Sequence, residues 1–68
     1  MPVTKVIEVI GSSTEGSDDA VRQALEAASR SVRGITRIDV VSVTCDVEDG
    51  GIARWNALVK MQFPVEPR

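Results

Sequence analysis

Two long alternating segments flank the tetrapeptide EDGG at positions 48–51. In residues 35–47 and 52–63, β-branched, aromatic and other apolar residues alternate with polar ones, which is the pattern of half-buried strands. The glycines between the two segments are typical of a tight hairpin turn. At the usual rise per residue, strands of this length extend over about 40 Å. Any further element of the fold must pack against this hairpin.

The alternation predicts how the two strands pair. A three-residue loop of Asp49-Gly50-Gly51 puts the odd-numbered residues of both strands on one apolar face, whereas a slip by one residue mixes apolar and polar residues on both faces. The favoured register pairs Val47 with Ala53, Cys45 with Trp55, Val43 with Ala57, Val41 with Val59 and Asp46 with Arg54.

The first strand of the hairpin changes the face that carries its apolar residues. Val41 and Val43 are odd-numbered, whereas Ile38 and Val40 are even-numbered. One extra residue at Val40–Val41, a β-bulge, would return all four to the core face. The bulge would also place three polar residues on the face away from the core: Arg37, Asp39 and Asn56.

The preceding residues predict a strand, a loop and a helix. Residues 3–10 are β-branched and indicate a strand, and residues 11–16 are turn formers. A helix is predicted over 17–33, with Ser17 as its N-cap and Gly34 after its end. Its apolar stripe consists of Val21, Ala24, Leu25, Ala28 and Val32.

The order β-α-β-β predicts an α+β fold in one domain, residues 1–68. The crossover helix should make the first two strands parallel, and the last strand should lie between them, antiparallel to both. A helix of about 16 residues is roughly 24 Å long, so it cannot cover the hairpin. We therefore expect a neighbouring subunit to cover the apolar end that carries Phe63. The alternative is that the strands are shorter and their ends fray.

Composition excludes several functional classes. The chain has 68 residues, a net charge of −2, no histidine and a single cysteine, Cys45. A disulfide within the chain, a zinc site and a CxxC redox motif are therefore excluded. No basic cluster or aromatic platform points to nucleic acid, and no apolar run is long enough to span a bilayer. A lone cysteine and the lack of a signal-peptide pattern favour the cytoplasm. Catalysis is not expected, because the chain has no histidine and shows no arrangement of a nucleophilic side chain with a general base.

The chain resembles the dodecin family over nearly its whole length. The resemblance is carried by "KVIEVIGSS", "DDAVRQALEAASRSVRGI", "VEDGGI" and "ALVKMQF". It implies a three-stranded antiparallel sheet that partly wraps one helix, and twelve copies that form a hollow shell. It also implies a non-enzymatic protein that stores or sequesters flavin, FMN or riboflavin, with flavins bound in pairs near two-fold axes.

The segment "TRIDV" departs from the dodecin pattern. The resemblance places Arg37 where flavin-binding members have a stacking tryptophan, and Asn56 where they have a glutamine that hydrogen-bonds the ring. Trp55 cannot replace the missing tryptophan, because neighbouring strand residues point to opposite faces. The candidate ligand-binding residues are thus Arg37, Asp39 and Asn56.

Two alternatives remain open from the sequence. Arg37 can pair with Asp39 or with an acidic residue of another subunit, or its guanidinium can contact a ligand. A branch of the family that lacks the tryptophan is described as calcium-binding. The alternative to flavin is therefore a shell that binds a divalent cation such as calcium, or one that binds no small ligand and serves a structural role. The acidic residues form two groups without EF-hand spacing, near the hairpin turn and near the helix start: Asp46, Glu48 and Asp49; Glu15, Asp18 and Asp19.

Overall fold

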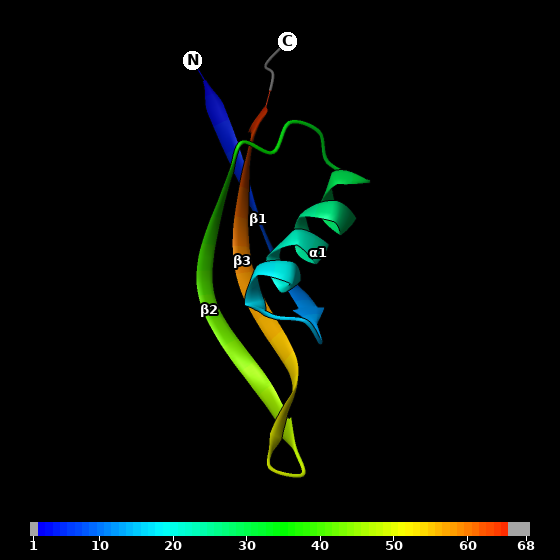
Figure 1. Ribbon diagram of the computed structural model, residues 1–68. Helices are drawn as coiled ribbons and strands as arrows, with labels where there is room; N and C mark the ends of the chain where they lie inside the picture. Colours follow the sequence, from blue (N-terminus) through cyan, green and yellow to red (C-terminus); the bar gives the residue numbers. More distant parts are fainter. Residues whose placement is uncertain (1, 66–68) are drawn as a thin grey trace.

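The computed structural model describes residues 2–65 and contains one sheet and one helix. The elements follow the chain as β1 (Val3–Ser13), α1 (Ser17–Ser29), β2 (Arg37–Glu48) and β3 (Gly51–Val65) (Figure 1). The sheet order is β1-β3-β2, and β3 is antiparallel to both neighbours. The predicted β-α-β-β order and the central position of the last strand are confirmed. The hairpin strands are long, which contradicts the alternative of short strands with frayed ends.

The bulge is as predicted, and so is the register in the middle of the hairpin. Cys45 lies opposite Trp55, Val43 opposite Ala57 and Asp46 opposite Arg54. Val59 pairs with Val40 rather than with the predicted Val41, and Ser42 pairs with Leu58, so Val41 is the extra residue of a β-bulge. Because of this bulge, Ile38 and Val40 lie on the same side of the sheet as Val43 and Cys45.

The hairpin turn differs from the prediction. Glu48 pairs with Gly51, so the turn has two residues, Asp49 and Gly50, rather than three. Both have positive φ, 52° and 78°, which is the type I′ geometry that matches the twist of the flanking strands. Val47 pairs with Ile52, and a second irregularity leaves Ala53 unpaired before the predicted register resumes.

The first strand is longer and the helix shorter than the sequence indicates. β1 continues through residues 11–13, which were expected in a loop, and Gly11 pairs with Ala57. The helix is capped by Gly16 rather than Ser17, and it ends at Ser29 instead of Arg33. Its last turn is tightened by bonds from Arg30 and Ser31 to carbonyls three residues back. Serines favour such local turns over a continued helix.

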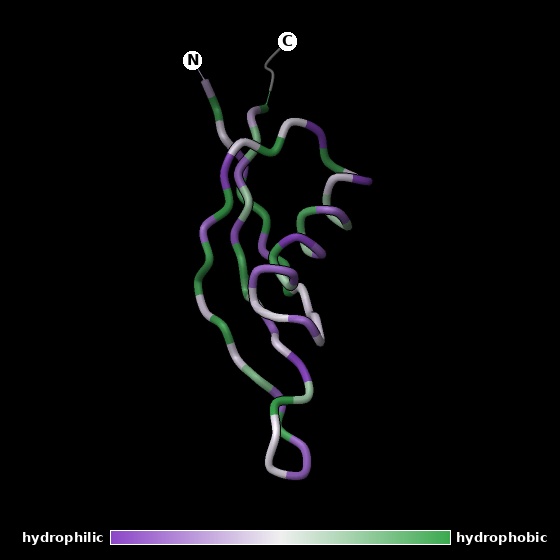
Figure 2. The backbone as a smooth tube through the Cα atoms, viewed as in Figure 1, coloured by the Kyte–Doolittle hydropathy of each residue, from purple (hydrophilic) through white to green (hydrophobic). Residues whose placement is uncertain are grey.

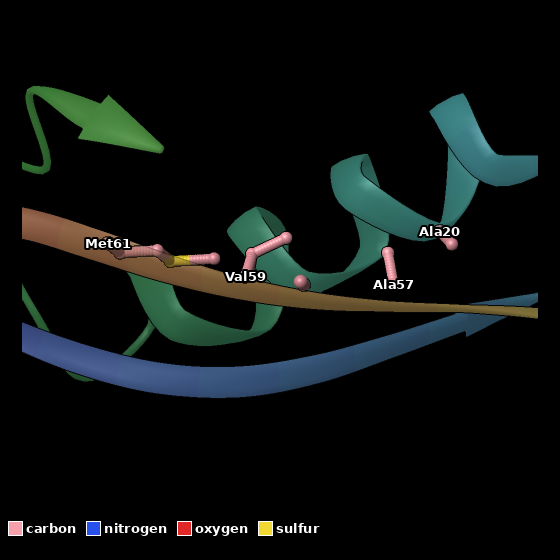
Figure 3. Close-up of a cluster of buried hydrophobic side chains, with 5 residues drawn as sticks. Ala20, Ala57, Val59 and Met61 are labelled. Atoms are coloured by element: carbon pink, nitrogen blue, oxygen red, sulfur yellow. The ribbon is translucent and has the colours of Figure 1, made fainter. Parts of the chain in front are cut away.

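Small side chains bring the helix close to the sheet. The fully buried core consists of Ala20, Ala24, Ala57, Val59 and Met61, and Figure 3 shows four of these between α1 and β3. Ala20 was not in the predicted stripe, and Leu25, which was, is 37% exposed. Only a residue without a Cβ fits at Gly11, because an added Cβ would overlap the carbonyl oxygen of Ala20. Contact at this short range favours alanine over leucine on the facing helix.

The helix packs on β1 and β3 and leaves much of β2 uncovered. We call the helix-side residues of β2 the uncovered strip: Val40, Val43, Cys45 and Val47. All four are exposed, with Val40 at 53% and Val43 at 43%. The predicted register puts Cys45 on the apolar face, facing the core, but Cys45 is exposed because this chain does not cover that part of β2. Phe63 itself is half-buried. The predicted apolar end is nevertheless exposed at Val3 (52%) and Val65 (39%), which pair beyond Phe63, so exposed apolar surface lies both at this end and along β2.

The overall shape supports the expectation that a single chain needs cover from a neighbouring subunit. The molecule measures 54 × 20 × 13 Å and has a Cα radius of gyration of 14.1 Å, against about 11 Å for a compact domain of this length. The β2–β3 hairpin extends well past the helix (Figure 1), and hydrophobic positions recur along this part (Figure 2). With three alanines among five core residues, cover from another molecule would contribute much of the stability.

Candidate functional site

The three residues expected to contact a ligand lie on the sheet face away from α1. Arg37 is opposite Gln62 and Asp39 is opposite Lys60, while Asn56 belongs to the same even-numbered face of β3. The buried residues Ala57, Val59 and Met61 occupy the odd-numbered positions that face the helix. The bulge at Val41 thus places the polar residues of β2 as the sequence predicts. Whether they bind a ligand stays a prediction.

Arg37 and Asp39 form an ion pair at one end of this face. The Arg37 Nε donates to Asp39 Oδ1 at 3.3 Å, and Gln62 Nε2 donates to Asp39 Oδ2 at 3.3 Å. The Arg37 side chain is 68% exposed, so the pair contributes little stability. The pairing alternative is therefore observed within one chain, but the terminal nitrogens of the guanidinium have no partner among residues 2–65. They can still bind an anion or lie over an aromatic ring.

Asn56 belongs to a second group of polar side chains on the same face. Its Oδ1 accepts a hydrogen bond of 2.8 Å from Ser12 Oγ on β1, and its Nδ2 donates one of 3.1 Å to Asp46 Oδ1 on β2. Asp46 lies opposite Arg54 as predicted, yet the described residues show no ion pair between them. The carboxylate instead bonds to Asn56, which links all three strands.

Within one chain, the Arg37–Asp39 pair and the group around Asn56 are too far apart to form one site. Arg37 lies opposite Gln62, six residues along β3 from Asn56, so the two Cα rows are roughly 20 Å apart. An open hollow lies beside Asn56, with Ile10, Leu58, Ser42 and Thr44 as its other lining residues. A single flat ring in this hollow can contact Asn56 but not the Arg37 of the same chain.

Sequence reasoning missed three residues of these groups. Gln62 follows from the register once the bulge is counted, because Val40 opposite Val59 leads to Arg37 opposite Gln62. Ser12 was expected in a loop and not in a strand beside Asn56. Asp46 was paired with Arg54, since opposite charges across strands attract, and nothing in the sequence indicated the diagonal bond to Asn56.

The acidic residues do not form a metal site within one chain. No group of three or more acidic or cysteine side chains that could hold a metal ion occurs in residues 2–65. Near the helix start, Asp19 Oδ2 accepts hydrogen bonds from Ser13 Oγ at 2.6 Å and Gln23 Nε2 at 3.4 Å. These two bonds, with the nearby charge of Arg22, lower the pKa of Asp19 from 3.8, the Ser13 hydroxyl having the largest effect.

We expect the Ser13→Ala variant to lose less stability in acid than the wild type loses. Because the pKa of Asp19 is lower in the folded chain, its ionised form stabilises the fold above pH 3.8, and this contribution is lost as the pH falls through the lowered value. Thermal unfolding should therefore show a smaller drop in Tm below pH 3.8 for the variant. Ser31→Ala, which removes an exposed serine hydroxyl elsewhere in the chain, serves as the control and should keep the wild-type slope. Equal slopes for Ser13→Ala and wild type would contradict the assignment.

The described residues contain no helix that is both long and apolar enough for a membrane span.

The family model for Dodecin matches residues 3–66. The chain belongs to the dodecin family. Dodecins are small binding proteins rather than enzymes; they assemble as homo-oligomers and typically bind flavins.

Individual dodecins are similar to the chain over nearly its full length. The dodecin from Streptomyces coelicolor is 36% identical, with 98% of this chain and 96% of that chain covered and a TM-score of 0.93. The dodecin from Streptomyces davaonensis is 30% identical, with 97% of both chains covered and a TM-score of 0.92. Among curated proteins, a dodecin of Thermus thermophilus is 25% identical over 94% of this chain and 93% of its own.

One similar structure is described as binding a metal. It is a calcium dodecin from Mycobacterium tuberculosis, a calcium-chelating antigen with a novel calcium-binding site. It is 29% identical to this chain, covers 96% of it with 93% of its own length, and has a TM-score of 0.82.

Proposed function

We propose that this dodecin-family chain forms a non-enzymatic homo-oligomeric shell, of twelve copies as the resemblance implies, that stores or sequesters flavin in the cytoplasm. The supporting observation is the arrangement of polar residues on the sheet face away from the helix. There, Asn56, one position that the resemblance assigns to ring contacts, lies beside an open hollow. Arg37, the other such position, lies farther along the same face, where it pairs with Asp39. The uncovered strip on the other face supports assembly, because its valines need cover from water.

Arg37 changes what such a site prefers. A guanidinium offers a smaller face than an indole, so stacking on the flavin ring is weaker. Its terminal nitrogens can instead bind a phosphate oxygen with charge-assisted hydrogen bonds, while Asp39 holds the Nε. Because Arg37 is far from Asn56 in one chain, both can contact one flavin only at its distant ends or where two copies meet. FMN is therefore the preferred flavin in this proposal.

We expect Arg37→Trp to strengthen the binding of riboflavin by about tenfold, since an indole restores a stacking surface. Arg37→Ala should remove the preference for FMN over riboflavin. Both effects can be measured by titrating each flavin and following the quenching of its fluorescence. Arg33→Trp, which adds the same indole outside the site, is the control and should leave both curves unchanged. Identical titrations for wild type and Arg37→Trp would place the flavin elsewhere.

Calcium is a second candidate ligand, favoured by the similarity to the calcium dodecin. Since one chain lacks a group of suitable ligands within residues 2–65, the carboxylates would have to come from two or more copies. The same flavin titrations separate the two functions. A protein that does not quench micromolar flavin, and whose Tm rises on addition of calcium, would favour the metal.

A further inference from the structure

The carboxamide of Asn56 is tied to both neighbouring strands. Ser12 Oγ donates to its Oδ1 at 2.8 Å from β1, and its Nδ2 donates to Asp46 Oδ1 at 3.1 Å on β2. Ser12 and Asn56 lie directly opposite each other in the sheet, while Asp46 is diagonal to Asn56. A short side chain with a hydrogen bond on each side has little rotational freedom.

The chemistry of the two partners decides which way round the carboxamide points. The carboxylate of Asp46 can only accept hydrogen bonds, whereas the hydroxyl of Ser12 can donate or accept. The arrangement with Nδ2 toward Asp46 satisfies both partners, and the flipped one would set two acceptors, the amide oxygen and the carboxylate, against each other. Asp46 therefore fixes the donor end of Asn56, and Ser12 adapts to the acceptor end.

Asn56 keeps a donor and an acceptor for a ligand. A carboxamide has two N–H groups and two oxygen lone pairs, and the bonds to Ser12 and Asp46 use one of each. The remaining donor and acceptor, on the two atoms bonded to Cγ, are complementary to a heterocycle whose ring N–H stands next to a carbonyl. The hollow beside Asn56 has the apolar side chains of Ile10 and Leu58 for a flat ring to lie on.

We infer that Asp46 and Ser12 are positioning residues, which hold the Asn56 carboxamide so that it recognises the imide edge of a flat heterocycle in this hollow. The inference rests on the proposed flavin binding and deepens it. It adds a positioning role for Ser12 and Asp46 to the ring contact that the resemblance assigns to Asn56. Asp46 would otherwise be one charge in an acidic hairpin.

The test compares riboflavin with N3-methylriboflavin, which lacks that ring N–H, by fluorescence quenching on the full chain. For the wild type, we expect riboflavin to bind about tenfold more tightly. Asp46→Asn should reduce this ratio several-fold, because an amide can donate as well as accept and no longer fixes Asn56. Asp46→Glu keeps a carboxylate and should retain most of the ratio. A purely structural effect would weaken both ligands equally and leave the ratio unchanged.

Glu48→Gln is the matched control, since it removes one negative charge two residues along the same strand. It should leave the ratio as in the wild type. The same measurements in the Arg37→Trp background provide a stronger binding signal. If either background binds riboflavin and N3-methylriboflavin equally, or if Asp46→Asn keeps the full ratio, the inference is overturned and the proposed function stands. If neither background binds riboflavin, both are overturned.

Discussion

An alanine at position 11 is expected to destabilise the fold by about 3 kcal/mol, the upper part of the range for overpacked cores. The new Cβ would overlap the carbonyl oxygen of Ala20 and come within 2.8 Å of Ala24 Cβ. The carbonyl oxygen is backbone and cannot rotate away, so α1 must shift from the sheet. That shift would open the contacts of Ala57, the fully buried residue opposite Gly11.

Thermal unfolding followed by circular dichroism measures this effect. For a chain of this size, each kcal/mol corresponds to about 4–8 °C in Tm, so the Tm of Gly11→Ala should be lower by about 12 °C or more. Gly51→Ala is the matched control: Gly51 has no positive φ, and the nearest atom to an added Cβ is Glu48 O at 3.9 Å. Its Tm should stay near that of the wild type. A Gly11→Ala protein as stable as Gly51→Ala would refute the close helix–sheet contact.

The strand pairing could be predicted because both hairpin strands alternate. Each residue of one strand that faces the core requires an apolar partner, and a single bulge at Val41 reconciles Ile38 with Val43. The turn could not be settled in the same way. The segment EDGG is compatible with a two- or a three-residue loop, and the structure uses the shorter one by leaving Ala53 unpaired. Both loops give the same pairing from Asp46–Arg54 to Val43–Ala57, so the alternation does not decide between them.

The errors around Gly11 share one physical cause. Glycine and serines predict a loop locally, but here the absence of a Cβ serves a close helix–strand contact within a strand. The same contact buries Ala20 and Ala24 and leaves Leu25 partly exposed. The prediction from hydrophobicity therefore omitted Ala20 and included Leu25. At this short distance between helix and sheet, the size of the side chain decides what is buried.

The candidate site was predictable to the level of the sheet face and no further. Alternation places Arg37, Asp39 and Asn56 on one side, but the distance between Arg37 and Asn56 depends on the register beyond the bulge. The hydrogen bonds of Asn56 depend on Ser12 being in a strand and on side-chain rotamers. Polar cross-strand contacts of this kind carry no periodic signal, so they became visible only in the structure.

We expect Val43→Glu to dissociate the assembly. Val43 is 43% exposed in the single chain and lies in the uncovered strip, opposite the buried Ala57. If another copy covers this strip, the glutamate loses water without gaining a partner, which costs at least about 2 kcal/mol per copy. The cost is repeated in every subunit of a symmetric assembly. Sedimentation should show the wild type as an oligomer and the variant shifted toward the 7.3 kDa chain.

Ala27→Glu adds the same side chain at an exposed helix position and should leave the oligomer intact. Cys45 supplies an independent readout, because it is two residues from Val43 and exposed in the single chain. A thiol reagent should react slowly with Cys45 in the wild type and in Ala27→Glu, and quickly in Val43→Glu. Fast reaction in all three proteins, together with a wild type that sediments as a single chain, would mean that water and not a second copy covers β2. The proposed shell would then have no physical basis, since its assembly depends on the burial of this strip.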